Sequence, residues 1–152
     1  MFNKMTSLFK QLFPADVAHA HCDGPCGVYD PAQARVHAEA VLSMAKKLNA
    51  IDLANGGIEA HNTFARYVAI KEEEAHATKT DLLVLWTDFF KPAHLKQFPN
   101  LHETIWWATK QCSACKTGVS VEDAEKLLAM VETIHNMFWQ AKGRDVAWVR
   151  AS

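Results

Sequence analysis

Apolar residues recur with a helical period in four successive stretches of this chain, separated by short segments rich in glycine, proline and asparagine. The spacing predicts helices over about residues 31–49, 58–90, 100–117 and 121–142. The apolar steps are four residues in the first stretch, seven in the second, and alternately three and four in the last two. The positions expected to face the core are Val36, Ala40, Met44 and Leu48; His61, Val68, Ala75, Leu82 and Phe89; Leu101, Ile105, Ala108, Cys112 and Cys115; and Val121, Ala124, Leu128, Val131, His135 and Phe138.

The ends of these stretches carry residues that start and stop helices. Asp30 is a good N-cap and Pro31 a good first helical residue, while Ser120 with Asp123 makes a weaker version of a capping box. Glycine or proline follows each stretch, and residues 144–152 show no clear period. Amphipathic helices joined by short loops pack side by side. We therefore expect an all-α, up-and-down four-helix bundle without strands.

Residues 1–20 have a different pattern from the rest. Their apolar residues recur at helical spacing among lysines, whereas an export signal needs an uninterrupted apolar stretch. Pro14 and Asp16 end this amphipathic pattern and leave an extended segment up to Ala20. We expect residues 1–20 to be a propeptide of a cytoplasmic protein, removed by a protease that cuts between Ala20 and His21. Ala18 and Ala20 resemble a signal cleavage site, so export is the alternative.

Composition excludes several classes of protein. The 152 residues suit one domain, 49% are hydrophobic, and the net charge is −1, which gives no basic surface for nucleic acid. No apolar run approaches the roughly 20 residues that span a bilayer, so we expect neither nucleic acid nor membrane partners. The four cysteines form two close pairs, too few for a disulfide scaffold.

The segment from His21 to Asp30 places one imidazole, two thiols and a phenol within ten residues. Cys22 and Cys26 are separated by three residues, including Pro25, so the chain can fold back and bring both sulfurs to one ion. After a cut before His21, the new amine, the Cys22 amide nitrogen and the two thiolates form a planar set of two nitrogens and two sulfurs. Planar geometry favours nickel or copper over zinc. We call residues 21–29 the hook.

Two motifs resemble the nickel superoxide dismutase family. HCDGPCGVYD at residues 21–30, followed by PAQAR at 31–35, is similar to the start of its mature chain. VLWTDFFKP at residues 84–92 is similar to a second segment of the family, in which a tyrosine stands at the position of Phe89. The resemblance covers most of residues 21–92.

The resemblance implies a function and a set of site residues. It implies disproportionation of two superoxide anions to dioxygen and hydrogen peroxide by Ni(II)/Ni(III) cycling, with one nickel ion per subunit of a homohexamer. The implied metal ligands are His21, whose imidazole is axial, with Cys22 and Cys26. Tyr29 would stand over the open face of the metal and Asp23 would help to hold the hook. Lys91 would attract the anion.

The sequence departs from the family around the axial imidazole. The family holds it with a glutamate on the first helix and an arginine on the second, whereas the corresponding positions here are His37 and Glu74. Our hypothesis is that Glu74 accepts a hydrogen bond from the His21 ring and that His37 completes the network.

Other interpretations of the same residues stay open. A nickel or copper delivery protein would use the same ligands without turnover, and a structural helical protein would pair Cys22 with Cys26 in a disulfide. Cys112 and Cys115 lie on a predicted core face, which favours buried thiols over a redox motif. We expect residues 71–74 to be a solvated helix face, and the tryptophans to serve as core or subunit-contact residues.

Overall fold

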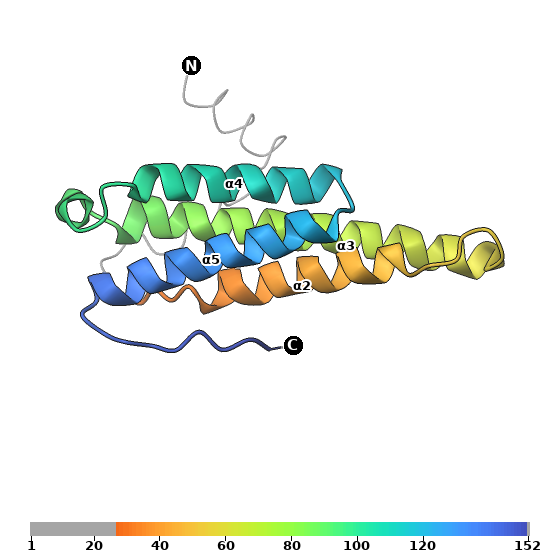
Figure 1. Cartoon of the computed structure of the whole chain (residues 1–152), viewed down its shortest axis with the longest axis horizontal. Helices are drawn as coiled ribbons and strands as arrows, with labels where there is room; N and C mark the ends of the chain where they lie inside the picture. Colours follow the sequence, from red (N-terminus) through yellow and green to blue (C-terminus); the bar gives the residue numbers. More distant parts are fainter. Residues whose placement is uncertain (1–26, 152) are drawn as a thin grey trace, which may run out of the picture.

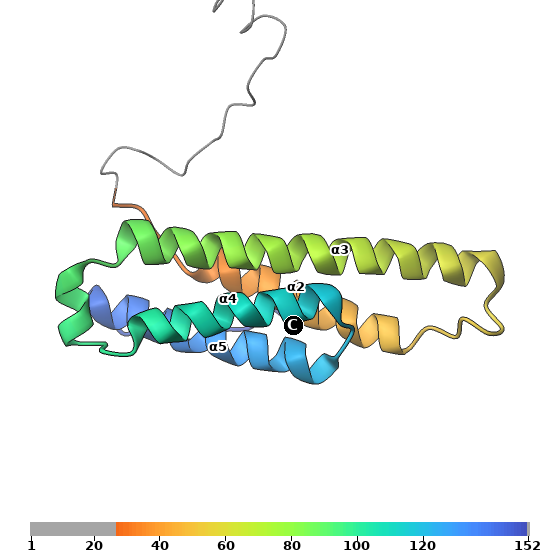
Figure 2. The ribbon, with the colours of Figure 1, turned by 90° about the horizontal axis from the view of Figure 1, so that it is seen from above.

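The computed structural model describes residues 27–151 and contains helices and loops, with no strand in that range. Four long helices form the domain: α2 (Ala32–Asn49), α3 (Gly57–Val84), α4 (Leu101–Thr117) and α5 (Val121–Ala141). Each packs against its neighbours in the sequence, and α5 also packs against α2 and closes the ring (Figures 1 and 2). The helices alternate in direction, which confirms the predicted all-α four-helix bundle.

Local chemistry fixes where the helices begin. The Asp30 carboxylate accepts the Ala32 backbone N–H at 2.8 Å, and the Ser120 hydroxyl accepts the Asp123 backbone N–H at 3.0 Å. Both bonds satisfy donors that a helix start leaves without a partner inside the helix. Gly57, the first residue of α3, has a φ of 62°, a conformation that favours glycine. The Ser120 cap is as predicted, whereas the N-cap of α2 is Pro31 rather than Asp30, so this helix begins at Ala32, one residue later than expected.

The second helix does not continue as an α-helix to residue 90. After Val84 the chain forms a π-helical turn, η1 (Leu85–Phe89), in which the Phe90 N–H donates to the Leu85 carbonyl at 3.0 Å. The extra residue per turn changes the direction of the side chains beyond Val84. Lys91 is extended, Pro92 opens a short 3₁₀ helix, η2 (Pro92–Lys96), and the loop then leads to α4.

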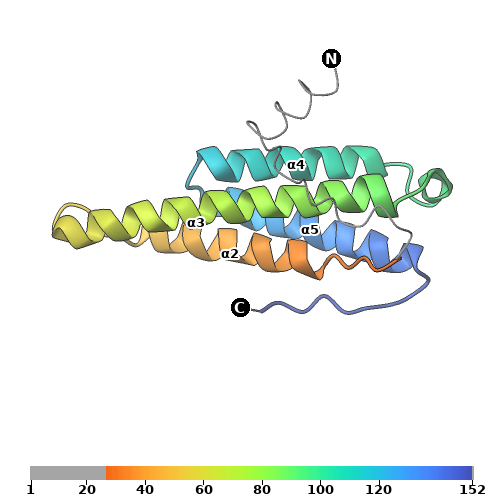
Figure 3. The same ribbon diagram turned by 180° about the vertical axis from the view of Figure 1, so that it is seen from behind.

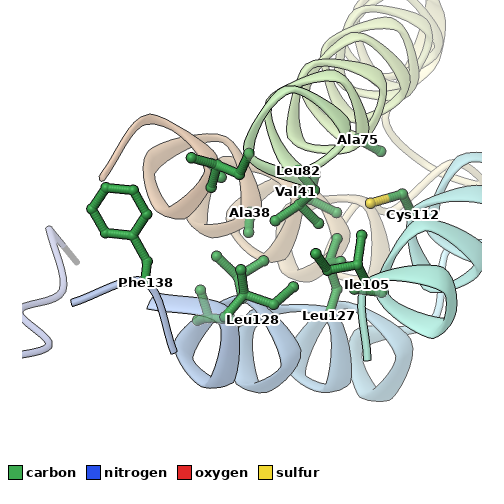
Figure 4. Close-up of a cluster of buried hydrophobic side chains, with 14 of the residues drawn as sticks. Ala38, Val41, Ala75, Leu82, Ile105, Cys112, Leu127, Leu128 and Phe138 are labelled. Carbon is green, nitrogen blue, oxygen red and sulfur yellow. The ribbon is translucent and has the colours of Figure 1, made fainter. Parts of the chain in front are cut away.

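The core lies along the axis of the bundle. Figure 4 shows side chains from all four helices pointing into this interior: Ala38, Val41, Ala75, Leu82, Ile105, Cys112, Leu127, Leu128 and Phe138. Alanines at several of the buried positions let the helices approach closely, and the larger side chains each contribute roughly 1.5–3 kcal/mol through burial. No helix in residues 27–151 is both long and apolar enough to cross a bilayer.

The predicted core faces of α4 and α5 are confirmed, but those of α2 and α3 are partly wrong. Val36 is 42% exposed, and α2 instead buries a face that includes Ala34, Ala38 and Val41. A strict four-residue step drifts around a helix of 3.6 residues per turn, so it cannot stay on one face. His61 is exposed and bonds the Gly57 carbonyl at 2.8 Å, because the first turns of α3 extend past the ends of α4 and α5 (Figure 1).

The C-terminal tail, residues 144–151, runs back along the bundle beside α5 and α2 (Figure 3). Its Val146 carbonyl lies 2.9 Å from the His135 Nε2 atom, and the Trp148 ring packs edge-on against the His135 ring. The Ala151 N–H donates to the buried Glu39 carboxylate at 2.8 Å. A segment without a periodic sequence pattern is therefore held by contacts to two helices.

Candidate metal centre

The hook enters the bundle through Gly27, Val28 and Tyr29. The predicted ligands His21, Cys22 and Cys26, and also Asp23, lie outside the described residues. Gly27 has a φ of 67°, which favours glycine and turns the chain where the hook meets the bundle. The half-buried Tyr29 ring lies 6.0 Å from the Phe89 ring, measured between centroids. The end of the hook therefore packs against Phe89 in the second motif, residues 84–92.

A pocket of about 400 Å³ opens between the end of the hook and the end of the bundle. Its walls come from three separate parts of the chain, namely the hook, the region of η1 and η2, and the C-terminus of α5. The lining residues are Gly27, Tyr29, Asp88, Phe89, Lys91, His94, Ala141 and Lys142. Two of the sequence-predicted residues, Tyr29 and Lys91, therefore share one pocket.

The π-helical turn supplies the floor of this pocket. The Phe89 ring packs on Phe138 at a centroid distance of 4.2 Å and is stacked on His94 at 5.7 Å. The Lys91 backbone N–H donates to His94 Nδ1 at 3.1 Å, so this ring carries its proton on Nε2. Phe89 stands where the segment that residues 84–92 resemble has a tyrosine, so this side of the pocket is an aromatic hydrocarbon surface without a phenol.

Sequence reasoning missed Lys142, which brings a second lysine to the pocket. The Lys142 ammonium lies 5.7 Å from the Phe89 ring centre and 5.0 Å from the Phe138 ring centre, and it donates to the Tyr29 carbonyl at 3.4 Å. Cations bind favourably to aromatic faces. Lys142 comes directly after the apolar pattern of α5, from which the sequence predicts a helix end. That pattern does not predict the contact of Lys142 with Tyr29, 113 positions earlier in the chain.

His37 and Glu74 are in direct contact between α2 and α3. His37 Nδ1 lies 2.5 Å from Glu74 Oε2, and both side chains are partly exposed, at 22% and 26%. The Gln33 amide nitrogen lies 3.0 Å from His37 Nε2, so the network has Nδ1–H donating to the carboxylate and Nε2 accepting from Gln33. Among the described residues, Glu74 Oε1 has no hydrogen-bond partner. Asp81 lies 3.8 Å from His37 Nε2.

The two cysteines of α4 are buried free thiols, in agreement with the sequence expectation. Burial raises the pKa of Cys112 to about 12 and that of Cys115 to about 11, so both remain protonated near neutral pH. Within residues 27–151 no three His, Cys, Asp or Glu side chains group closely enough to hold a metal ion.

The expectation of a solvated face at residues 71–74 is wrong for Lys71. Its side chain is only 2% exposed, and its ammonium donates to the backbone carbonyls of Cys115 and Lys116 at the C-terminus of α4. These are carbonyls that a helix end leaves unsatisfied. Burial lowers the pKa of Lys71, and the residue acts as a cap between helices.

Comparisons with known proteins add to this geometry. The model of the nickel-containing superoxide dismutase family matches residues 16–142. A nickel superoxide dismutase of Streptomyces seoulensis is 40% identical over 136 residues, which are 89% of this chain and 98% of that protein. One of Streptomyces coelicolor is 37% identical over the same shares. A crystal structure of a nickel-containing superoxide dismutase with oxidised-state ligation is 40% identical, has a TM-score of 0.71, and covers 81% of this chain and 99% of its own.

Proposed function

The chain belongs to the nickel-containing superoxide dismutase family, and on this premise we propose which of its residues carry out the reaction. The protein is a nickel-dependent enzyme that converts two superoxide anions and two protons to dioxygen and hydrogen peroxide. The family match extends over the hook, and this one observation carries the functional conclusion. It supports turnover rather than metal delivery.

We propose that the hook holds the nickel after a protease cuts between Ala20 and His21. The donors are the new amine and the imidazole of His21, the amide nitrogen and thiolate of Cys22, and the thiolate of Cys26. This donor set fits nickel, because thiolates and a deprotonated amide donate electrons strongly. The bound nickel supplies a redox couple between Ni(II) and Ni(III). Asp23 helps to hold the hook in this arrangement.

The pocket at the end of the hook is our proposed entrance for superoxide. Tyr29 lines it, and its phenol restricts the approach to small anions and orients them. Two lysines, Lys91 and Lys142, line the same pocket against one carboxylate, Asp88, which supports a local attraction for an anion in a protein whose net charge is −1. Phe89 and Phe138 hold the exposed Lys142 ammonium in place at the edge of the pocket, because a cation binds favourably to aromatic faces.

We propose that the contact between His37 and Glu74 replaces the glutamate and arginine of the family. The Glu74 carboxylate already accepts from His37 through Oε2, and its Oε1 is available to accept from the His21 ring. A carboxylate that receives the N–H of a ligating imidazole fixes the orientation of the ring and raises its basicity. The chain would then keep a carboxylate beside the His21 imidazole but place it on α3.

Assembly and location complete the proposal. We propose a homohexamer, because a ten-residue segment at the end of a chain buries little surface by itself, so that neighbouring subunits would hold it in place. We also propose a cytoplasmic location, because the apolar residues before Pro14 are interrupted by lysines, unlike those of an export signal.

The test compares two forms of the protein, the uncut chain and one that begins at His21. Nickel content and superoxide consumption are measured on both. Nickel binding and activity should appear only in the trimmed form, since only that form has the free amine. Equal activity in both forms would remove the amine from the mechanism. A trimmed form that binds zinc, or that contains a disulfide between Cys22 and Cys26, would contradict the assignment of the ligands.

A further inference from the structure

The outer face of α4 exposes two adjacent tryptophans. Trp106 is 47% exposed and Trp107 is 50% exposed, although tryptophan side chains are usually mostly buried. Glu103 precedes them by one turn and Lys110 follows them by one turn, and both are exposed. The four positions are i, i+3, i+4 and i+7 of one helix, so they lie on one face. We call these four residues the α4 stripe.

Hollows on both sides of Trp107 give this surface relief. One, of about 420 Å³, is lined by Trp86, His102, Glu103, Trp106 and Trp107. The other, of about 250 Å³, is lined by Asn100, Glu103, Thr104, Trp107, Met130 and Thr133. Trp107 therefore projects between two depressions. An exposed aromatic ridge beside apolar hollows is typical of a surface that contacts another protein.

The aromatic side chains of this surface are already held in place. Trp86 Nε1 donates to His102 Nδ1 at 2.7 Å, and Trp107 Nε1 donates to Glu103 at 3.4 Å. The Lys110 ammonium lies 5.2 Å from the centre of the Trp106 ring. Side chains that are fixed before association lose little conformational entropy when a partner covers them.

The order of charges in the α4 stripe fits a second copy of this chain as its partner. Glu103 and Lys110 lie at equal distances from the point midway between Trp106 and Trp107, about 5 Å along the helix axis on either side. When two α4 helices pair in opposite directions about that point, each Glu103 meets the partner's Lys110 and the tryptophans meet one another. A purely acidic partner would place like charges against Glu103, and a purely basic partner would place like charges against Lys110. We propose that the α4 stripe binds the α4 stripe of a second copy of this chain across a twofold axis.

The first test measures mass in solution, with the full chain, by light scattering over a dilution series. Trp106→Ser with Trp107→Ser should reduce the assembled mass to half or less, because a twofold contact joins copies in pairs. The matched control, Ile58→Ser with Val119→Ser, changes two other exposed apolar residues, which are 75% and 45% exposed, and should leave the mass unchanged. Circular dichroism establishes that both variants stay helical. An unchanged mass for the tryptophan variant overturns the proposal.

The second test reverses the charges. Glu103→Lys alone or Lys110→Glu alone should weaken association roughly tenfold, because like charges then meet. The double variant should restore it, and a mixture of the two single variants should also associate. Glu59 and Arg66 are an exposed acid and base with the same spacing on α3, and reversing them is the control. A double variant as weak as the single ones excludes the antiparallel pairing.

The inference is distinguishable from the enzymatic proposal and from other partners of the face. An active, nickel-loaded protein whose mass ignores every α4 variant would overturn the inference and leave the enzymatic proposal intact. An inactive protein that shows the expected changes in mass would support the inference and contradict the enzymatic proposal. A third outcome would point to the N-terminal segment as the occupant of the face. In that case removing residues 1–20 would expose tryptophan to a fluorescence quencher, and the tryptophan variant would keep its mass. This result would overturn the inference.

Discussion

Removing the Glu74 carboxylate is the sharpest test of how this chain departs from its family. Its carboxylate contacts His37 at 2.5 Å, a geometry in which a hydrogen bond to a charged group contributes roughly 1.5–3 kcal/mol when buried. Both side chains are about a quarter exposed, at 22% and 26%, and solvent screening reduces the expected coupling to about 1 kcal/mol. If Glu74 also supports the His21 imidazole, Glu74→Ala should lower superoxide consumption roughly 10- to 100-fold.

The assay is a double-mutant cycle with His37→Ala, Glu74→Ala and the combined variant, followed by urea unfolding. Superoxide consumption and the spectrum of oxidised nickel are measured on the same trimmed proteins. Lys46 and Glu125 provide the control, because they form an exposed pair between α2 and α5 at 3.9 Å. Their cycle should give a smaller coupling and unchanged activity. Wild-type turnover and an unaltered nickel spectrum in Glu74→Ala would refute the proposed role, whatever the stability shows.

Three further predictions follow from buried and pocket-lining groups. Lys71→Met should lower the free energy of unfolding by about 2 kcal/mol, because two carbonyls at the end of α4 lose their donor. Because burial lowers the pKa of Lys71, the folded chain loses this proton at a lower pH than the unfolded chain does. The free energy of unfolding of the wild type should therefore rise, relative to that of the variant, as the pH rises from the lowered pKa towards 10.5. Parallel pH profiles of the two proteins in urea unfolding would contradict this. In a Cys22→Ser, Cys26→Ser background, Cys112 and Cys115 should resist iodoacetamide near neutral pH until the chain is unfolded, and rapid labelling of the folded protein would show that they are not buried thiols. Lys142→Gln should slow superoxide consumption severalfold at low ionic strength and much less in about 1 M salt, where screening acts over roughly 3 Å. Lys47→Gln is its control, since that lysine also lies over an aromatic ring but not at the pocket, and equal effects would rule out local attraction.

Local features of the molecule were predictable from the sequence because they depend on residues close together in the chain. The bond from the Ala32 N–H to Asp30 and the bond from the Asp123 N–H to Ser120 each join residues two or three positions apart. The hook motif is equally local, and with the second motif it was enough to identify the family. The core positions of α4 and α5 follow the same logic, since their apolar steps average close to the helical repeat.

Other features were decided only by how the helices pack. Alignment with the family singled out His37 and Glu74 one at a time. Only the packing of α2 on α3 brings His37 Nδ1 to 2.5 Å from Glu74 Oε2. Lys71 lies in a charged run that suggests solvent, and it is buried because the end of α4 comes to rest above it. Lys142 reaches Tyr29 across 113 positions. A pattern in one helix shows which of its faces is apolar, whereas the partner of each polar group depends on which element is placed opposite it, and that is a property of the packed bundle.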